Sequence, residues 1–393
     1  MVALSVSGAC VAQTPSPHAD PLAYDPLVKD ACLHFYNLDY DGALTRFEQV
    51  VKLHPNEPMA YSYELMVTIF RELYHQDLLD TTYYAHDSFL TTQRRVDIPQ
   101  ATRNRIEALT NQVQSMVDER LKANGNDKNA LFARGYARGL HAAFITLADH
   151  SYVTAARQGL SARNDSEAVL KIDPDYADAD MAIGIQQFAV ASLPRLVRLV
   201  VGIAGVGGNK ERGLTLVRTS AEKGVVTTVE ARTTLSLFLR HDGRYAEALE
   251  VQHGLAAQFP HDYLFRLEEA NLTKDKGDGP GAIVIYKQVL ADARKPGFFA
   301  DPRLQMAWFG LADTERGQND VTEAAKHYLE AADQPNASDW LRKRAQLNAG
   351  EMFDLMHDRA NALTQYNKAL AGGGDQSQAD TAKKYLKTPY AGK

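Results

Sequence analysis

A pattern of small and aromatic residues recurs between residues 225 and 374. In its cleanest copy, Gly350 is followed twelve positions later by Ala362, four later by Tyr366 and three later by Ala369. Three earlier copies contain Ala324, Tyr328 and Ala331; Ala270, Ala282, Tyr286 and Val289; and, less regularly, Ser236, Tyr245, Ala248, Leu255 and Pro260. Four copies in register exceed what chance supplies, so the pattern predicts a repeated structural unit.

Close packing of two antiparallel helices explains the pattern. A small residue lets the backbones approach, and an aromatic residue nearby fills the gap beside the contact. The equivalent alanines Ala248, Ala282, Ala324 and Ala362 lie 34, 42 and 38 positions apart, so the connecting loops vary. A helix pair of about 34 residues is typical of tetratricopeptide repeats (TPR), which must stack to bury their apolar faces. The sequence therefore predicts an all-α fold, a TPR-like α-solenoid of antiparallel helix pairs.

The pattern also occurs near the start of the chain, with Ala31, Tyr40, Ala43, Phe47 and Pro55 at matching positions. The repeat architecture is therefore predicted to span the chain. We expect five parts: a signal-peptide remnant and linker (1–24), an N-terminal TPR-like helical region (25–127), an irregular helical region with a glycine-rich loop (128–224), a C-terminal TPR array (225–374), and a capping helix and tail (375–393).

Two local features refine this plan. The aromatic residues Tyr61, Tyr63, Phe70 and Tyr74 follow helical spacing, which favours a place in the core over an aromatic-lined groove. A polar helix is predicted over residues 100–123, with Gly125 as its left-handed cap.

The middle of the chain resembles a known family. The segments DPDYADA (173–179), IG (183–184), an apolar stretch after Pro194, a glycine loop, ERGL (211–214) and AEKG (221–224) resemble bacterial TPR proteins. These are similar in turn to the eukaryotic tetratricopeptide-repeat-domain-39 and mitochondrial inclusion-body-clearance family. The resemblance implies an all-helical fold without established catalytic residues. The eukaryotic loop usually reads Gly-Asp-Arg, whereas this chain has Gly208-Asn209-Lys210.

The first residues resemble the end of a secretory signal. A short run of small apolar residues leads to a possible cleavage point after Ala12, followed by a Pro/Ser linker. Export, with a periplasmic location in a bacterium, is the first expectation. An outer-membrane lipoprotein attached through Cys10 and an untargeted leader are the alternatives. The formal net charge of -6 offers no basic footprint for nucleic acid.

Catalytic signatures are absent from the sequence. It contains no HExxH, CxxC or GxSxG motif, and Lys210 lacks the neighbours of a phosphate-binding Walker loop. Five aspartates between Asp165 and Asp180 lack the spacing of a calcium loop, so inter-helix loop acids are favoured. We therefore predict a non-enzymatic protein without cofactor or metal.

The first helix of each pair in a TPR solenoid lines a concave groove that can bind a peptide or partner helix. By the repeat register, the groove candidates are Leu237, Arg240, Leu267, Asn271, Lys274, Arg344, Leu347, Glu351 and Asp354. The leading hypothesis is a scaffold for a protein or peptide in the bacterial cell envelope. One alternative is a membrane-surface or lipid-handling accessory that uses the apolar stretch Leu193–Ala204. The other is an enzyme with an unrecognised site.

Overall fold

The computed structural model describes residues 15–79, 81–83, 96–193, 207–372 and 375–392. Within these ranges the regular secondary structure is entirely helical, with no strand. The all-α, TPR-like prediction is therefore confirmed. The leader before residue 15 and most of the apolar stretch Leu193–Ala204 lie outside the described residues, so the hypotheses that depend on them stay predictions.

The first half of the chain forms long antiparallel helices. They are α1 (Pro26–Tyr36), α2 (Tyr40–Leu53), α3 (Pro58–His75), α4 (Gln100–Ala123), α5 (Lys128–Phe144), α6 (Tyr152–Ile172) and α7 (Asp180–Ser192). Single turns occur at η1 (Pro21–Tyr24), η2 (Thr81–Tyr83), η4 (Ile145–Asp149) and η5 (Ala177–Ala179). The small-residue helix α5 contacts α3, α4, α6 and α7, so it is central to this half.

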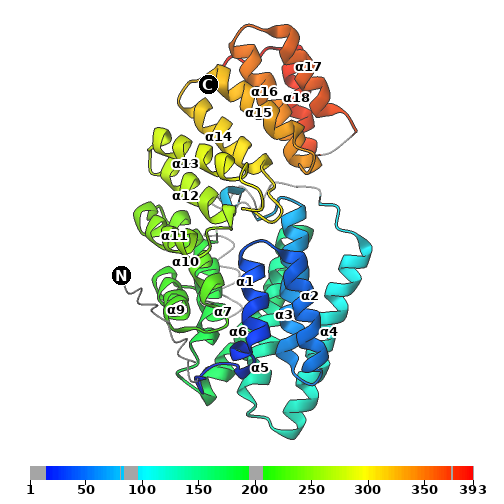
Figure 1. Ribbon diagram of the computed structural model, residues 1–393, viewed down its shortest axis with the longest axis vertical. Helices are drawn as coiled ribbons and strands as arrows, with labels where there is room; N and C mark the ends of the chain where they lie inside the picture. Colours follow the sequence, from blue (N-terminus) through cyan, green and yellow to red (C-terminus); the bar gives the residue numbers. More distant parts are fainter. Residues whose placement is uncertain (1–14, 80, 84–95, 194–206, 373–374, 393) are drawn as a thin grey trace, which may run out of the picture.

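The second half is a stack of helix pairs. Its helices are α9 (Lys210–Lys223), α10 (Thr228–His241), α11 (Tyr245–Gln258), α12 (Tyr263–Asp275), α13 (Gly279–Asp292), α14 (Gln305–Gly317), α15 (Val321–Asp333), α16 (Asp339–Leu355), α17 (Arg359–Leu370) and α18 (Gln376–Lys387). The first helices of successive pairs touch, α12 with α14 and α14 with α16. We call the side lined by α10, α12, α14 and α16 the inner face of the array (Figure 1).

Glycines show why the repeat pattern needs small residues. A Cβ atom on Gly350 would lie 2.5 Å from the Tyr366 ring, and one on Gly310 would lie 2.6 Å from the Tyr286 ring. Between α7 and α9, a Cβ on Gly184 would lie 2.9 Å from the carbonyl oxygen of Gly213. The missing side chains therefore give the tyrosine rings and the crossing backbones their space.

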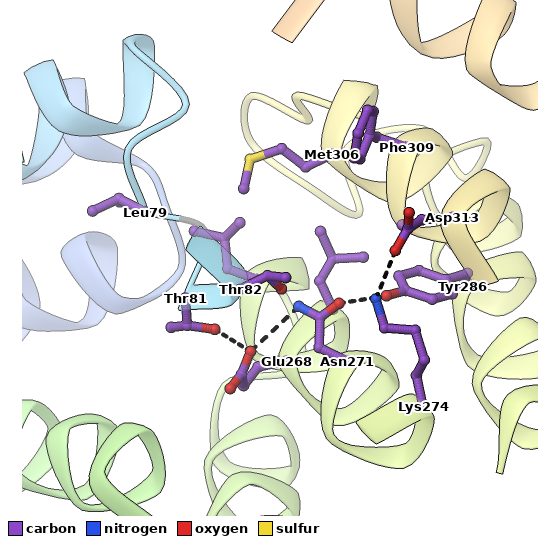
Figure 2. Close-up of a pocket in the computed structure, with 13 residues that line it drawn as sticks. Leu79, Thr81, Thr82, Glu268, Asn271, Lys274, Tyr286, Met306, Phe309 and Asp313 are labelled. Carbon is purple, nitrogen blue, oxygen red and sulfur yellow. Dashed lines mark hydrogen bonds and ion pairs between the residues drawn. The ribbon is translucent and has the colours of Figure 1, made fainter. Parts of the chain in front are cut away.

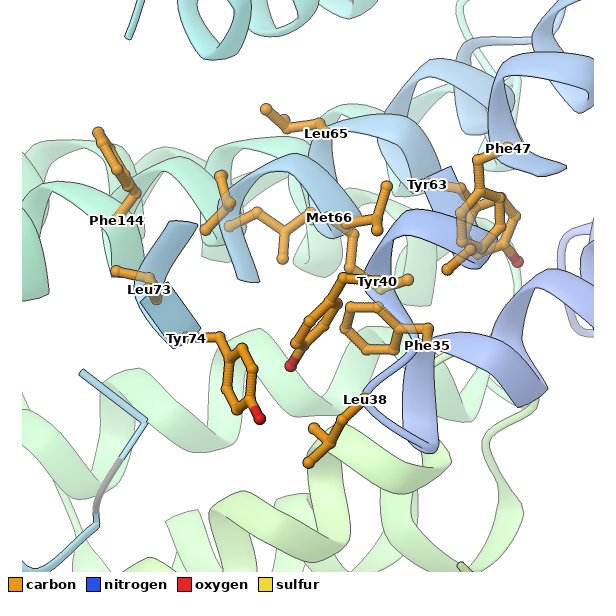
Figure 3. Close-up of a cluster of buried hydrophobic side chains, with 14 of the residues drawn as sticks. Phe35, Leu38, Tyr40, Phe47, Tyr63, Leu65, Met66, Leu73, Tyr74 and Phe144 are labelled. Atoms are coloured by element: carbon orange, nitrogen blue, oxygen red, sulfur yellow. The ribbon is translucent and has the colours of Figure 1, made fainter. Parts of the chain in front are cut away.

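Aromatic side chains fill the core of the N-terminal half (Figure 3). The rings of Phe47 and Tyr63 stack with centroids 5.3 Å apart, and Phe35 meets Tyr40 edge to face. Tyr63 and Tyr74 are each only 2% exposed. Their assignment to the core is therefore confirmed, and they line no open groove.

The N-terminal half folds back onto the array (Figure 1). Tyr36 of α1 donates a hydrogen bond from its hydroxyl to Glu230 of α10 (2.8 Å). At the end of α3, the hydroxyls of Tyr74 and Tyr263 lie 2.8 Å apart, and Asp77 accepts hydrogen bonds from the Gln305 amide (2.7 Å) and the Ser338 main-chain N–H (2.8 Å). These contacts join residues that are 189 to 261 positions apart in the sequence.

One local prediction was wrong. Gly125 is not among the residues with positive φ. Instead, the turn after α4 is held by the Asn124 side chain, which accepts a hydrogen bond from the main-chain N–H of Asn126 (3.1 Å). Because the asparagine side chain shapes this turn, a left-handed glycine is not required there. Among the described helices, none combines the length and apolarity needed to cross a bilayer.

Candidate functional site

A tyrosine of the second helix orients a polar side chain on the inner face in three successive pairs. The hydroxyl-to-oxygen distances are 2.5 Å from Tyr286 to Asn271, 3.3 Å from Tyr328 to Asp313 and 2.8 Å from Tyr366 to Asp354. Burial, reinforced by the nearby carboxylates, raises the pKa of Tyr328 and Tyr366. These two hydroxyls therefore stay protonated and act as permanent donors.

A basic residue stands three positions after each groove-facing position, and each one binds an acid of the next pair. Arg240 bonds Asp275 (2.8 Å), Lys274 bonds Asp313 (3.2 Å) and Arg316 bonds Glu351 (2.8 Å). We call these three ion pairs and the three tyrosine hydrogen bonds together the ladder. The side-chain exposure of its basic members rises along the array from 1% for Arg240 to 21% for Lys274 and 29% for Arg316. Ligand access to the ladder therefore increases toward α16.

A cavity of about 60 Å³ opens on the inner face between η2, α12, α13 and α14 (Figure 2). Apolar side chains contribute most of one side, and polar side chains surround them. The lining residues are Leu79, Thr81, Thr82, Leu264, Leu267, Glu268, Asn271, Lys274, Tyr286, Met306, Phe309, Gly310 and Asp313. Thus the N-terminal half supplies one wall and the array supplies the others.

Hydrogen bonds fix the polar wall of this pocket on the side of α10. Glu268 accepts hydrogen bonds from the Thr81 hydroxyl, from Arg240 Nη1 (3.1 Å) and from the Asn271 amide (3.3 Å). Arg240 Nη1 also donates to the Thr81 hydroxyl oxygen (3.1 Å). On the opposite side, the Lys274 and Asp313 side chains are 21% and 42% exposed. The polar groups that an incoming molecule meets first are therefore Lys274 and Asp313.

Part of the array is similar to known proteins. Residues 267–339 match the tetratricopeptide repeat. No curated protein matches the sequence. Among solved structures, the chain is similar to the Cut9–Hcn1 hetero-tetramer of the APC/C at a TM-score of 0.51 and 13% identity, covering 94% of this chain and 56% of that one. This chain thus spans about half the length of that protein, and the likeness shows the fold alone.

Two further solved structures have lower scores. Yeast Tom70 gives a TM-score of 0.43 at 11% identity, covering 92% of this chain and 87% of that one. A tetratricopeptide repeat protein from Parabacteroides merdae gives 0.36 at 13% identity, covering 83% and 98%. The residues that match the tetratricopeptide repeat, 267–339, run from α12 to the start of α16.

The pocket brings together three of the nine predicted groove residues, Leu267, Asn271 and Lys274. The other six lie outside it. On α10, Arg240 is buried behind Glu268 and Leu237 is half-buried. On α16, Arg344 is exposed, Leu347 is buried against α17, and Glu351 and Asp354 lie on the inner face. A binding role for all nine stays a prediction.

Sequence reasoning missed Asp313 and Arg316 although a signal was available. Asp313 and Arg316 repeat the three-residue offset of Asn271 and Lys274 on the next first helix. The wall formed by Leu79, Thr81 and Thr82 had no such signal, because these residues belong to no repeat position. Their contribution depends on the fold-back of the N-terminal half.

Other residues that could take part in catalysis or ligand binding make contacts within the protein instead. His253 lies 2.9 Å from Glu269, and His261 lies 2.7 Å from the carbonyl oxygen of Phe298. The side chain of Asn209 accepts a hydrogen bond from the main-chain N–H of Arg212 (2.9 Å) and so caps α9, and Lys210 pairs with Asp242 (2.8 Å).

His18, Asp173 and Asp175 could together offer ligand atoms to a metal ion. Lys128, however, lies 2.5 Å from the Asp173 carboxylate. The lysine already supplies a positive charge there, so we assign no metal to this cluster.

Proposed function

We propose that this chain is a non-enzymatic scaffold that binds an extended segment of a partner protein along the inner face of its array. The pocket between α12 and α14 carries the proposal. Its volume of about 60 Å³ is far below the roughly 300–1,000 Å³ of sites for small molecules. A cavity of this size accommodates one side chain of a longer ligand.

The chemistry of the pocket suits a peptide segment. Met306, Phe309 and Leu267 provide apolar contact for an inserted side chain. Asn271 and the Lys274–Asp313 ion pair surround that contact with donors and acceptors, which can hydrogen-bond a peptide main chain. Because Tyr286 fixes the Asn271 side chain, this polar group needs no reordering when a ligand binds.

A charge exchange tests the site without removing the internal ion pair. The double variant Lys274→Asp with Asp313→Lys keeps opposite charges at positions 274 and 313 but reverses the sign of the charge that a ligand meets at each position. Affinity capture from an envelope fraction should recover a partner with the parent chain and lose it with this variant. The matched control, Glu119→Lys with Lys122→Glu, exchanges an exposed pair on α4 and should retain the partner.

Circular dichroism and thermal melting must first show that both exchanges leave the fold intact. Equal recovery of the partner by the parent and both variants would place binding away from this pocket. Turnover of a small molecule that survives repurification and is lost only in the pocket variant would support the enzyme hypothesis instead.

We propose further that the scaffold works in a bacterial envelope. The support is the signal-like opening of the sequence, with its possible cleavage point after Ala12. Mass spectrometry of the chain recovered from its natural host tests this. A mass corresponding to a start at Gln13 supports export, a lipid adduct on Cys10 supports the lipoprotein alternative, and an uncleaved cytoplasmic chain contradicts both.

A further inference from the structure

The segment Thr388–Gly392 returns from the end of α18 to the inner face of α14 and α16. Tyr390 donates a hydrogen bond from its main-chain N–H to Asp354 Oδ2 (2.8 Å), and Arg316 Nη2 donates one to the Tyr390 hydroxyl (3.0 Å). The Arg316 guanidinium also lies 5.6 Å from the centroid of the Tyr390 ring. The segment thus contacts the most exposed part of the ladder as a bound peptide would.

The receiving surface is held in place by other parts of the array. The Asp354 side chain is 1% exposed, accepts a hydrogen bond from the Tyr366 hydroxyl (2.8 Å) and pairs with Arg359 (2.9 Å). Arg359 also donates to the carbonyl oxygens of Tyr385 and Leu386 at the end of α18. Arg316 is positioned by its ion pair with Glu351 (2.8 Å). The contacts that orient Asp354 and Arg316 therefore do not depend on Tyr390.

The occupying segment is held at one residue. Tyr390 is half-buried, whereas Lys387, Thr388, Pro389, Ala391 and Gly392 are all exposed. Its contacts are the hydrogen bonds with Asp354 and Arg316, the cation–π contact, and an edge-to-face contact with the Tyr385 ring (centroids 5.3 Å apart). Because only one residue of the segment is even partly buried, a competing ligand has one side chain to displace.

We propose that the inner face of α14 and α16 is a docking site for an extended, tyrosine-bearing segment of a partner protein, and that Thr388–Gly392 occupies it as a tethered ligand. Asp354 accepts the main-chain N–H of the incoming tyrosine, and Arg316 contacts its ring and hydroxyl. This inference rests on the proposed function and deepens it, because it names the chemistry that the inner face recognises. The partner binds by displacing Tyr390, so the chain's own segment sets the concentration at which binding begins.

A peptide titration tests the proposal with the full chain. The probe is a fluorescent peptide of residues 387–392, Lys-Thr-Pro-Tyr-Ala-Gly, blocked at both ends so that terminal charges play no part. Since a short tether gives an effective concentration on the order of millimolar, the Tyr390→Ala chain should bind the peptide about tenfold more tightly than the parent chain. A peptide with alanine in place of tyrosine should not bind either chain.

A second substitution checks the receiving side. Adding Arg316→Gln to the Tyr390→Ala chain should weaken peptide binding about fivefold or more, because both the hydroxyl contact and the ring contact are lost. The matched control, Arg212→Gln, removes the same charge from an exposed position on α9 and should leave the affinity unchanged. Circular dichroism spectra of equal helical content and a cooperative melting transition in every chain establish that folding is preserved.

Three results would overturn the proposal. They are no saturable peptide binding by a folded Tyr390→Ala chain, equal affinity of that chain and the parent, and a parent dimer that Tyr390→Ala converts to monomer. The last would mean that the segment occupies the face of a second copy.

Because the peptide titration leaves Lys274 and Asp313 untouched, it can fail while partner capture through the pocket succeeds, or the reverse. Its failure is therefore distinguishable from failure of the proposed function.

Discussion

The inner face of the array has two regions with the same ladder and different covers. Over α10 and α12, the N-terminal half covers it with buried side chains, among them Tyr74, which is 2% exposed. Over α14 and α16, a short segment covers it through Tyr390 between exposed neighbours. The exposure of the ladder arginines differs in the same way. The Arg240 side chain is 1% exposed, whereas the Arg316 side chain is 29% exposed.

The difference shows that a repeated surface takes its role from what lies against it. Arg240 is enclosed with Glu268 and Asp275, and its hydrogen bonds reach Thr81 and Thr82 of the N-terminal half. It therefore fastens the two halves of the molecule together. Arg316, at the equivalent position two pairs later, keeps its access to solvent and can meet a ligand.

Removing the two arginines should give the largest contrast. Arg240→Ala leaves Glu268, which is 6% exposed, without its positive partner. Breaking a buried ion pair on one side typically costs about 3–5 kcal/mol, so we expect a loss of that size in the free energy of unfolding measured with urea. Arg316→Ala also leaves a buried acid, because Glu351 is 7% exposed. Arg344 lies near that carboxylate as a second positive charge, and the Arg316 side chain is partly hydrated, so we expect a smaller loss of about 1–2 kcal/mol. Similar losses for the two variants would contradict the distinction between the covers.

The cover over α10 should also make stability depend on pH. Glu230 accepts hydrogen bonds from the hydroxyls of Tyr36 (2.8 Å) and Tyr136 (3.3 Å), and Cys32 and Asp178 lie near it. Burial is the main cause that raises the pKa of Glu230 from 4.5 to about 7. Between these pH values the folded chain binds more protons than the unfolded chain, so the contribution of Glu230 to stability falls as pH rises.

Replacement of Glu230 by glutamine isolates this effect. The stability difference between Glu230→Gln and the parent should shift in favour of the variant by about 1–3 kcal/mol between pH 4.5 and 8. Other buried acids, such as Asp262 with a pKa raised by burial to about 8, act in both chains and cancel in the difference. Urea unfolding at several pH values measures it, and a difference independent of pH would contradict the assignment.

The tyrosines beneath the ladder can be displaced with one methyl group. Gly350→Ala places a carbon 2.5 Å from the Tyr366 ring, and such overpacking should outweigh the gain in helix propensity, for a net loss of about 1–2 kcal/mol. Gly139→Ala on α5 meets nothing within 4 Å and should stabilise the chain by about 0.5–1 kcal/mol. If both variants were stabilised in urea unfolding, the tyrosine at this position would not be tightly packed.

The sequence predicted the parts of the fold that depend on nearby residues. Gly350, Ala362 and Tyr366 pack within one helix pair, so their spacing alone indicated the pair. The fold-back depends instead on contacts such as Tyr74 with Asp301 and Asp77 with Ser338, which are separated by 227 and 261 positions. No local periodicity records such contacts.

Residues 293–304 between α13 and α14 fall in the longest repeat interval, 42 positions, and they carry the Asp301 and Arg303 that meet the end of α3. The irregular interval was therefore the one trace of the closure in the sequence.

The candidate site likewise has a part that the repeat register predicted and a part that depends on the long-range fold. Asn271 and Lys274 were found from the repeat register because first helices present equivalent positions to the inner face. Arg240 has the same register, yet Thr81 and Thr82 enclose it from a part of the chain that the register does not include. Register predicts which side of a helix a residue occupies, and only the long-range fold decides whether that side is covered.

The smallest contrast concerns one hydroxyl in each cover. Tyr74→Phe removes the group that meets the Tyr263 hydroxyl and the carbonyl oxygen of Asp301, and because this site is buried the loss should be about 1 kcal/mol. Tyr390→Phe removes the acceptor for Arg316, whose partly exposed guanidinium can bond water instead, so the loss should stay below about 0.5 kcal/mol. Urea unfolding of both variants measures the two losses. If Tyr390→Phe cost as much as Tyr74→Phe, the segment over α14 and α16 would be a fixed part of the fold and would not exchange with a partner.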